Sequence, residues 1–127
     1  MNSNELKART KQFALRTIRL VAELPNNKIG NIIANQLLRS STSVGANYRS
    51  ACKARSKADF ISKITIVEEE ADECIYWFEL IVESGMMTNN QVDALINEAR
   101  ELTAIFTAAG KTAKHSNSKS TIRNPKS

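Results

Sequence analysis

Apolar side chains recur at alternating steps of three and four residues through most of this chain, the spacing that places them on one face of an α-helix. The clearest stripe consists of Phe60, Ile64, Val67, Ala71, Cys74, Phe78 and Ile81. The stripe before it keeps the same rhythm but is smaller and more polar: Ile33, Leu37, Ser40, Val44, Asn47 and Ala51. Two adjacent stripes of this spacing predict helices that pack against each other in a bundle.

Turn and capping residues divide the chain into four predicted helices, at about residues 4–23, 28–55, 56–84 and 90–109. Pro25 ends the first helix, Ser56 and Asp59 resemble a capping box, and Gly85 and Gly110 suit the positions that follow a helix. Short connections make neighbouring helices antiparallel. We therefore expect an all-α, antiparallel up-down-up-down four-helix bundle over residues 1–110, followed by a basic disordered tail over residues 111–127.

The same spacing predicts which side chains of the outer helices face the core. In the first helix these are Leu6, Phe13, Ala14, Ile18, Val21 and Leu24. In the fourth helix they are Val92, Leu95, Ala99, Leu102, Phe106 and Ala109.

Polar residues within a helix seam need hydrogen-bonding partners inside the bundle. We expect Ser40 and Asn47 to form such bonds, with Arg39, Glu70 and Glu73 as further members of a buried polar network. The rest of the acidic run at residues 68–73 is typical of a solvated helix face.

Sites for metals and for catalysis are not indicated. Di-metal centres in bundles use Glu-x-x-His pairs, and the single histidine is His115, outside the predicted helices. Ser40, Ser41 and Ser43 are small packing residues, and the chain contains no phosphate-binding loop, nucleophile elbow or Cys/His pair. We therefore expect no metal, no cofactor, no catalytic residues and no enzymatic activity.

The net charge of +5 is unevenly distributed along the chain. Residues 1–63 contain 12 Lys or Arg and 3 Asp or Glu, residues 64–110 contain 1 and 10, and residues 111–127 add 5 bases and no acid. The candidates for contact with the phosphates of RNA or DNA are Lys7, Arg9, Lys11, Arg16, Arg19, Arg49, Lys53, Arg55 and Lys57. The alternative is that these bases pair with the acidic helices of the same or a neighbouring subunit. Because the few aromatic residues leave no platform for base stacking, binding would be directed at the backbone and weakly sequence-specific.

The segment of residues 74–82, CIYWFELIV, is apolar on more of its circumference than one core covers. Tyr76, Trp77 and Leu80 lie off the main stripe and predict an oligomer interface. The alternative is that the first and fourth helices cover them.

Cys52 and Cys74 have no metal-ligand spacing, the first ten residues contain no apolar run that could act as a signal, and no apolar segment is long enough to span a bilayer. These features predict a cytoplasmic protein with free thiols that does not enter a membrane.

Three segments carry a family resemblance: RSSTSVGAN (residues 39–47), ARSKADF (54–60) and EEADECIYWFEL (69–80). Together they resemble the bacterial four-helix-bundle proteins encoded in intervening sequences of large-subunit ribosomal RNA genes, over most of residues 6–109. That family is similar to the accessory variability protein of diversity-generating retroelements, a basic bundle that binds nucleic acid and a reverse transcriptase. The resemblance implies a closed ring, often of five subunits, and a reverse transcriptase or other protein as a partner. Many members have an acidic residue where this chain has Ser50, so no role of that carboxylate is transferred.

These observations predict a non-enzymatic, homo-oligomeric bundle that binds RNA or DNA through its first two helices. The alternative is an interaction scaffold whose separated charges serve assembly or docking of a protein partner, with no nucleic acid bound.

Overall fold

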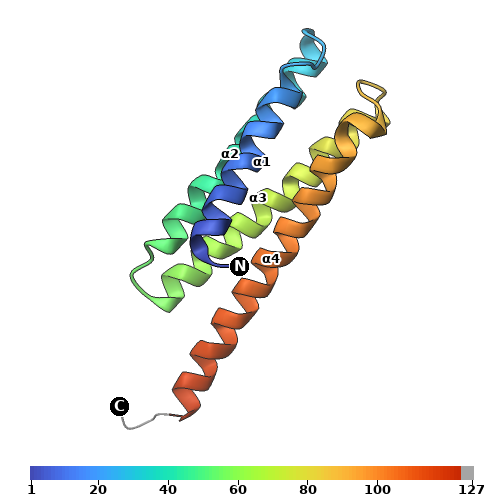
Figure 1. Ribbon diagram of the computed structural model, residues 1–127. Helices are drawn as coiled ribbons and strands as arrows, with labels where there is room; N and C mark the ends of the chain where they lie inside the picture. The colour runs from blue at the N-terminus through green and yellow to red at the C-terminus, as the bar shows by residue number, and fades with distance from the viewer. Residues whose placement is uncertain (124–127) are drawn as a thin grey trace.

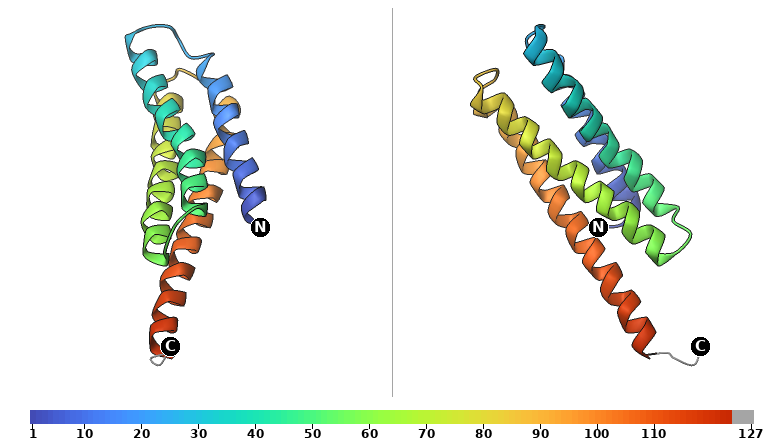
Figure 2. Two further views of the ribbon diagram at one scale, coloured as in Figure 1. Left: turned by 90° about the vertical axis from the view of Figure 1, so that its left-hand side faces the viewer. Right: turned by 180° about the vertical axis from the view of Figure 1, so that it is seen from behind.

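The computed structural model describes the backbone of residues 1–123 and the side chains of residues 1–116. Its helices are α1 (Ser3–Val21), α2 (Lys28–Cys52), α3 (Lys57–Glu83) and α4 (Asn89–Arg123). Consecutive helices run antiparallel, and α4 projects beyond the other three (Figure 1, Figure 2). Each helix packs against the next, and α1 packs against α4 less extensively. The predicted all-α, up-down-up-down four-helix bundle is confirmed.

Local capping contacts set both ends of α3. The Ser56 hydroxyl oxygen accepts the backbone N–H of Asp59 at 3.0 Å, which satisfies one of the free donors at the helix start. At the other end the N–H of Gly85 donates to the carbonyl of Val82 and the N–H of Met86 to the carbonyl of Ile81. This pair of hydrogen bonds requires a residue in the left-handed backbone conformation, and Gly85 adopts it with a φ of +82°. The predicted cap at Ser56 and stop at Gly85 are confirmed.

Two predicted helix ends are wrong. The second helix ends at Cys52 and not near Arg55, whose N–H instead donates to the Asp59 carboxylate as the chain turns into α3. The fourth helix does not stop at Gly110 but continues to Arg123. Gly110 is buried, and a Cβ on it would lie 3.5 Å from Ile64 Cγ2, so it serves as a packing residue within the helix. The division into a bundle of residues 1–110 and a tail of residues 111–127 stays a prediction, and residues 124–127 lie outside the described part.

The four helices share one core. On α3 the predicted stripe is buried from Ile64 to Ile81, and on α4 the predicted stripe is buried from Val92 to Phe106. The face predicted for α1 is partly wrong, because Ile18 is 43% exposed whereas Thr10 and Thr17 are fully buried. Their hydroxyls donate to the carbonyls of Leu6 and Phe13 on the same helix, at 2.8 and 2.9 Å. A threonine that satisfies its own hydroxyl in this way can face an apolar core.

Both cysteines are free thiols, with Cys52 exposed and Cys74 buried. Burial raises the pKa of the Cys74 thiol, which keeps it protonated. Among the described residues, no helix combines the length and the apolar character that crossing a bilayer requires.

The turn between α1 and α2 depends on a glycine. A Cβ added to Gly30 would lie 2.1 Å from the carbonyl oxygen of Pro25, a backbone atom that cannot easily move away. We expect Gly30→Ala to lower the free energy of unfolding by ~1–3 kcal/mol in denaturant melts.

Gly110→Ala is the matched control, because its added Cβ makes an ordinary contact with Ile64. It should leave stability unchanged or raise it by up to ~1 kcal/mol. A Gly30→Ala protein as stable as wild type would show that the turn is not as tight as described.

Candidate nucleic-acid interface

A groove between α1 and α2 brings three predicted binding residues together. It has a volume of about 220 Å³ and is lined by Lys7, Thr10, Lys11, Ala14, Thr42, Gly45, Ala46 and Arg49. Its floor is formed by small residues, and a Cβ on Gly45 would approach Thr10 Oγ1 to 3.3 Å, so glycine permits this close helix contact. Lys7 and Lys11 lie one turn apart on α1, and Arg49 lies opposite them on α2.

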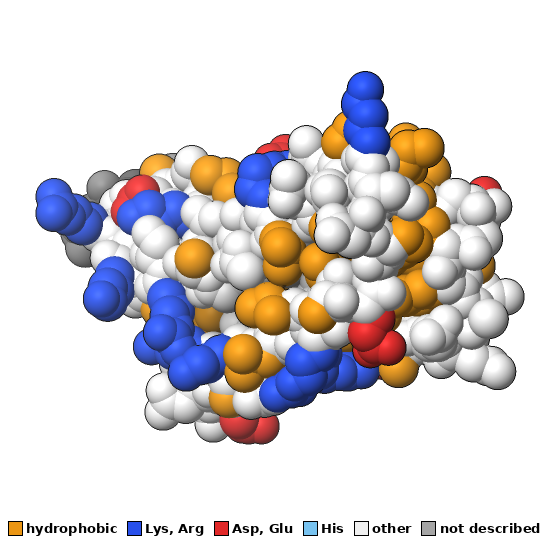
Figure 3. Space-filling model, turned by 90° about the horizontal axis from the view of Figure 1, so that it is seen from above, with side chains coloured by type: hydrophobic (Ala, Val, Ile, Leu, Met, Phe, Trp, Pro, Cys, Tyr) orange, Lys and Arg blue, Asp and Glu red, His pale blue; other side chains and the backbone are white. Residues whose placement is uncertain are grey.

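The three bases of this groove, Lys7, Lys11 and Arg49, form no ion pair within residues 1–116. We refer to them as the groove bases. Like charges gathered on neighbouring helices repel one another unless an anion lies between them. Figure 3 shows one face of the molecule on which most of the Lys and Arg side chains lie toward one side, with acidic side chains at several places between and beside them.

Arg9 differs from the groove bases, because two carboxylates of α4 hold it. Its guanidinium donates twice to Glu98 and once to Glu101, each at 2.8 Å. The hydrogen bond to Glu98 is the main reason why the pKa of Arg9 is raised. Arg9 therefore follows the ion-pairing alternative and ties α1 to α4.

The other predicted binding residues lie apart from the groove. Lys53, Arg55 and Lys57 are exposed around the α2–α3 turn, and Lys57 Nζ donates to Ser116 Oγ of α4 at 3.1 Å. Arg16 and Arg19 line a separate cleft between α1 and α4. Of the nine predicted bases, three thus line the groove, three surround the α2–α3 turn, two line the α1–α4 cleft, and Arg9 is paired with α4.

Four members of the predicted polar network meet between α2 and α3. One oxygen of Glu73, Oε2, accepts from Arg39 Nη2 and Ser40 Oγ, both at 2.5 Å, and from Trp77 Nε1 at 3.0 Å. Glu70 also pairs with Arg39, at 3.3 Å. Hydrogen bonds from Ser40 and Trp77, with the charge of Arg39, lower the pKa of the Glu73 carboxyl.

This network is only partly buried, and it does not include Asn47. Ser40 is fully buried, Glu70 and Glu73 are half-buried, and Arg39 is exposed. Asn47 is half-buried, and its amide donates to the carbonyl of Ser43 on its own helix at 2.9 Å. The prediction that Asn47 belongs to the network is therefore wrong, because its amide bonds within its own helix.

The predicted interface residues differ in exposure. Tyr76 is 55% exposed and its ring packs edge-on against that of Trp77, with centroids 5.1 Å apart. Trp77 and Leu80 are half-buried and pack against the core. Of these three residues, only Tyr76 is exposed.

Three polar contacts between helices could not be found from the sequence. Glu98 and Glu101 bind Arg9 from a position about 90 residues away, and Thr107 Oγ1 donates to Glu68 Oε2 at 2.6 Å between α4 and α3. Some acids of the run at residues 68–73 therefore form contacts between helices instead of facing solvent. Within the described residues, no three His, Cys, Asp or Glu side chains converge as metal ligands would.

The lowered pKa of Glu73 makes its contribution to stability pH-dependent. A carboxyl with a lowered pKa in the folded state stabilises the fold above its ordinary pKa of ~4.3, and this stabilisation is lost as the pH falls through the folded-state value. Glu73→Gln should therefore be less stable than wild type near neutral pH, and the difference should shrink below about pH 4.

Denaturant melts across this pH range provide the measurement. Glu69→Gln is the matched control, since Glu69 is exposed and accepts no hydrogen bond within residues 1–116. A deficit of Glu73→Gln that does not change with pH would contradict the assigned network.

Comparison with known proteins places this bundle in a family. The family model described as 23S rRNA-intervening sequence protein matches residues 2–108. The crystal structure of a protein of unknown function from the S23 ribosomal protein family of Bacteroides thetaiotaomicron is similar, with 36% identity and a TM-score of 0.80 over 87% of this chain and 99% of that one. Curated proteins gave no match. Because the family model matches nearly all of the four-helix bundle, the chain belongs to the family of 23S rRNA-intervening sequence proteins.

Proposed function

We propose that this protein binds RNA or DNA through the groove between α1 and α2, by contacts to phosphates. The observation that supports this most directly is the position of the groove bases, Lys7, Lys11 and Arg49, around one groove without an acidic partner in residues 1–116. The acids of α3 and α4 neutralise Arg9 and Arg39 but not these three. A phosphate backbone would supply the missing negative charge.

The chemistry of the groove favours backbone contacts over base recognition. Its floor consists of threonine, alanine and glycine, which cannot stack on a base, and its only charged groups are cations that bind phosphate oxygens. We therefore expect the contribution of the groove to binding to depend strongly on salt and weakly on sequence. Membership in a family that takes its description from 23S rRNA genes is compatible with an RNA ligand.

Neutralising a groove base should weaken binding and flatten its salt dependence. For Lys7→Gln, Lys11→Gln or Arg49→Gln, the slope of log affinity against log salt should fall in magnitude by ~0.7–0.9 for each lost phosphate contact. Fluorescence anisotropy with a labelled RNA strand between 50 and 200 mM salt would measure this slope.

Lys28→Gln removes the same charge at the opposite end of α2 and is the matched control, which should leave the slope unchanged. Absence of binding to any RNA or DNA at 50 mM salt would favour the alternative function, a scaffold that docks a protein partner. Equal effects of Lys28→Gln and the groove variants would place the contact elsewhere.

We further propose that the protein forms a homo-oligomer through the outer face of α3. Tyr76 and Ile66 are exposed on this helix, 55% and 40% respectively, among exposed acids such as Glu69 and Asp72. Exposed aromatic and aliphatic side chains of this kind are common at interfaces. The closed ring that the family resemblance implies would use a heterologous contact, in which this face meets a different face of the next subunit.

Tyr76→Ala should reduce the oligomeric mass without unfolding the subunit, because Tyr76 is outside the core. Light scattering should give a multiple of the 14.1 kDa chain for wild type and a smaller mass for the variant. Ser62→Ala, on an exposed position of the same helix, is the control. A monomeric wild type at tens of micromolar would contradict the proposal.

A further inference from the structure

A second cleft lies between α1 and α4, separate from the α1–α2 groove. It has a volume of about 400 Å³, within the range of ~300–1,000 Å³ that is typical of sites for small ligands. It lies between α1 and α4, which pack against each other less extensively than the other packed pairs of helices. Arg16, Arg19, Leu20, Glu23, Met87, Gln91, Ala94 and Leu95 line it.

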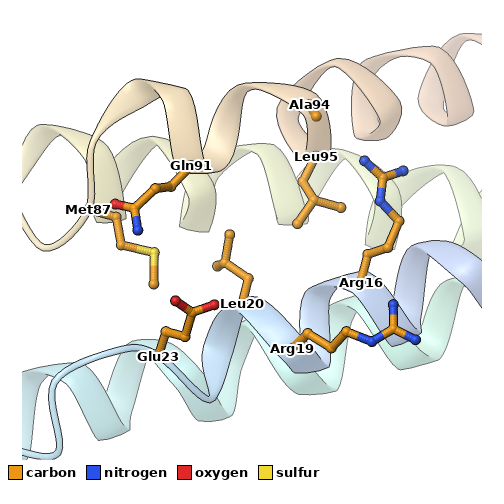
Figure 4. A pocket seen from close by; sticks show the side chains of 8 residues that line it. All are labelled: Arg16, Arg19, Leu20, Glu23, Met87, Gln91, Ala94 and Leu95. Carbon is orange, nitrogen blue, oxygen red and sulfur yellow. The ribbon is translucent and has the colours of Figure 1, made fainter.

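The lining of this cleft is chemically ordered from one end to the other (Figure 4). Arg16 and Arg19 both lie at one end, where the guanidinium group of Arg16 points toward α4 and that of Arg19 points away from it along α1. Leu20 and Leu95 point toward each other in the middle. Glu23 and Gln91 lie with Met87 at the opposite end, so that a cationic end, an apolar floor and an end rich in hydrogen-bond acceptors follow in sequence.

The charged groups of the cleft are available to a ligand. Neither arginine forms an ion pair with an acid in residues 1–116, and Glu23 is not paired with Arg19 although the two are four residues apart on α1. Leu20, Met87 and Leu95 are each at most 8% exposed, so their small accessible surface forms a fixed floor. A bare anion would use only the arginines and would leave this floor in contact with water.

We propose that this cleft binds a single nucleotide unit, with its phosphate on Arg16 and Arg19 and its base against Leu20 and Leu95. The inference rests on the proposed binding of nucleic acid and adds a site for one unstacked or terminal nucleotide. Sequence-selective recognition of RNA commonly uses bases that are turned out of the stack in this way. The α1–α2 groove then supplies affinity, and the α1–α4 cleft supplies selectivity.

The acceptors at the far end of the cleft determine which base fits. The carboxylate of Glu23 can only accept hydrogen bonds, and the amide of Gln91 can accept or donate. Guanine offers two neighbouring donors, its ring N–H and its amino group, to such a carboxylate. Uracil offers one N–H between two carbonyl oxygens that would repel it. The cleft should therefore prefer guanine to uracil.

Isothermal titration of the full chain with guanosine and uridine 5′-monophosphates and with inorganic phosphate tests this proposal. The guanosine nucleotide should bind about tenfold more tightly than the uridine nucleotide, the difference expected for one hydrogen bond to a charged group. Inorganic phosphate should bind more weakly than either. Glu23→Gln should remove the preference for guanosine, and Arg19→Gln should weaken binding of both nucleotides.

Glu23 and Arg19 are exposed, so both variants should fold, which thermal melts would verify. Lys63→Gln, on α3 and paired with Asp59, is the matched control for loss of one charge and should leave nucleotide binding unchanged. Equal affinity for the two nucleotides, or a preference that survives Glu23→Gln, would overturn the assignment.

The outcomes also separate this proposal from the proposed function. If RNA binds and responds to the groove bases while neither nucleotide binds, the cleft is wrongly assigned and the proposed function stands. If the nucleotides bind with the expected preference while no strand binds, the proposed function fails and the cleft remains a nucleotide site.

Discussion

Six side chains of α3, from Ile64 to Ile81, are buried, and α3 packs against both α2 and α4. Burying this stripe fixes the rotation of the helix, so the acids between its members lie at the edges of the seams or in solvent. Glu70 and Glu73 then meet α2, and Glu68 meets α4. The apolar stripe thus decides which acids contribute to helix pairing and which, such as Glu69 and Asp72, remain exposed.

The same constraint sorts the bases of α1 and α2 into two groups. Arg9 and Arg39 lie at the seams with α4 and α3, and carboxylates bind both of them. Lys7, Lys11 and Arg49 lie on the far side of α1 and α2, around a groove that no acid of α3 or α4 reaches within the described residues. The bases and acids that are separated along the chain therefore pair at the seams between helices. The bases around the α1–α2 groove keep their positive charge. That charge is the basis of the proposed binding.

Large apolar side chains made the fold predictable, because the stripes of α3 and α4 can be buried in only one orientation. The buried face of α1 was only partly predicted, because Thr10 and Thr17 are polar residues. Their hydroxyls donate to carbonyls of the same helix, which allows both side chains to face the core. The end of α4 was missed because Gly110 is buried by packing and does not cap the helix. The basic half of the chain was visible in the sequence. Which bases are neutralised was not, since the Arg9–Glu98 pair depends on α1 and α4 meeting in space.

Mapping lysine reactivity with and without bound RNA tests the central claim most directly, because it locates the contact without a mutation. Acetylation of the native chain, read by mass spectrometry, should show Lys7 and Lys11 protected by RNA, while Lys28, at the other end of α2, reacts as before. Unchanged reactivity of Lys7 and Lys11 in the presence of saturating RNA would contradict the account, as would equal protection of all three lysines.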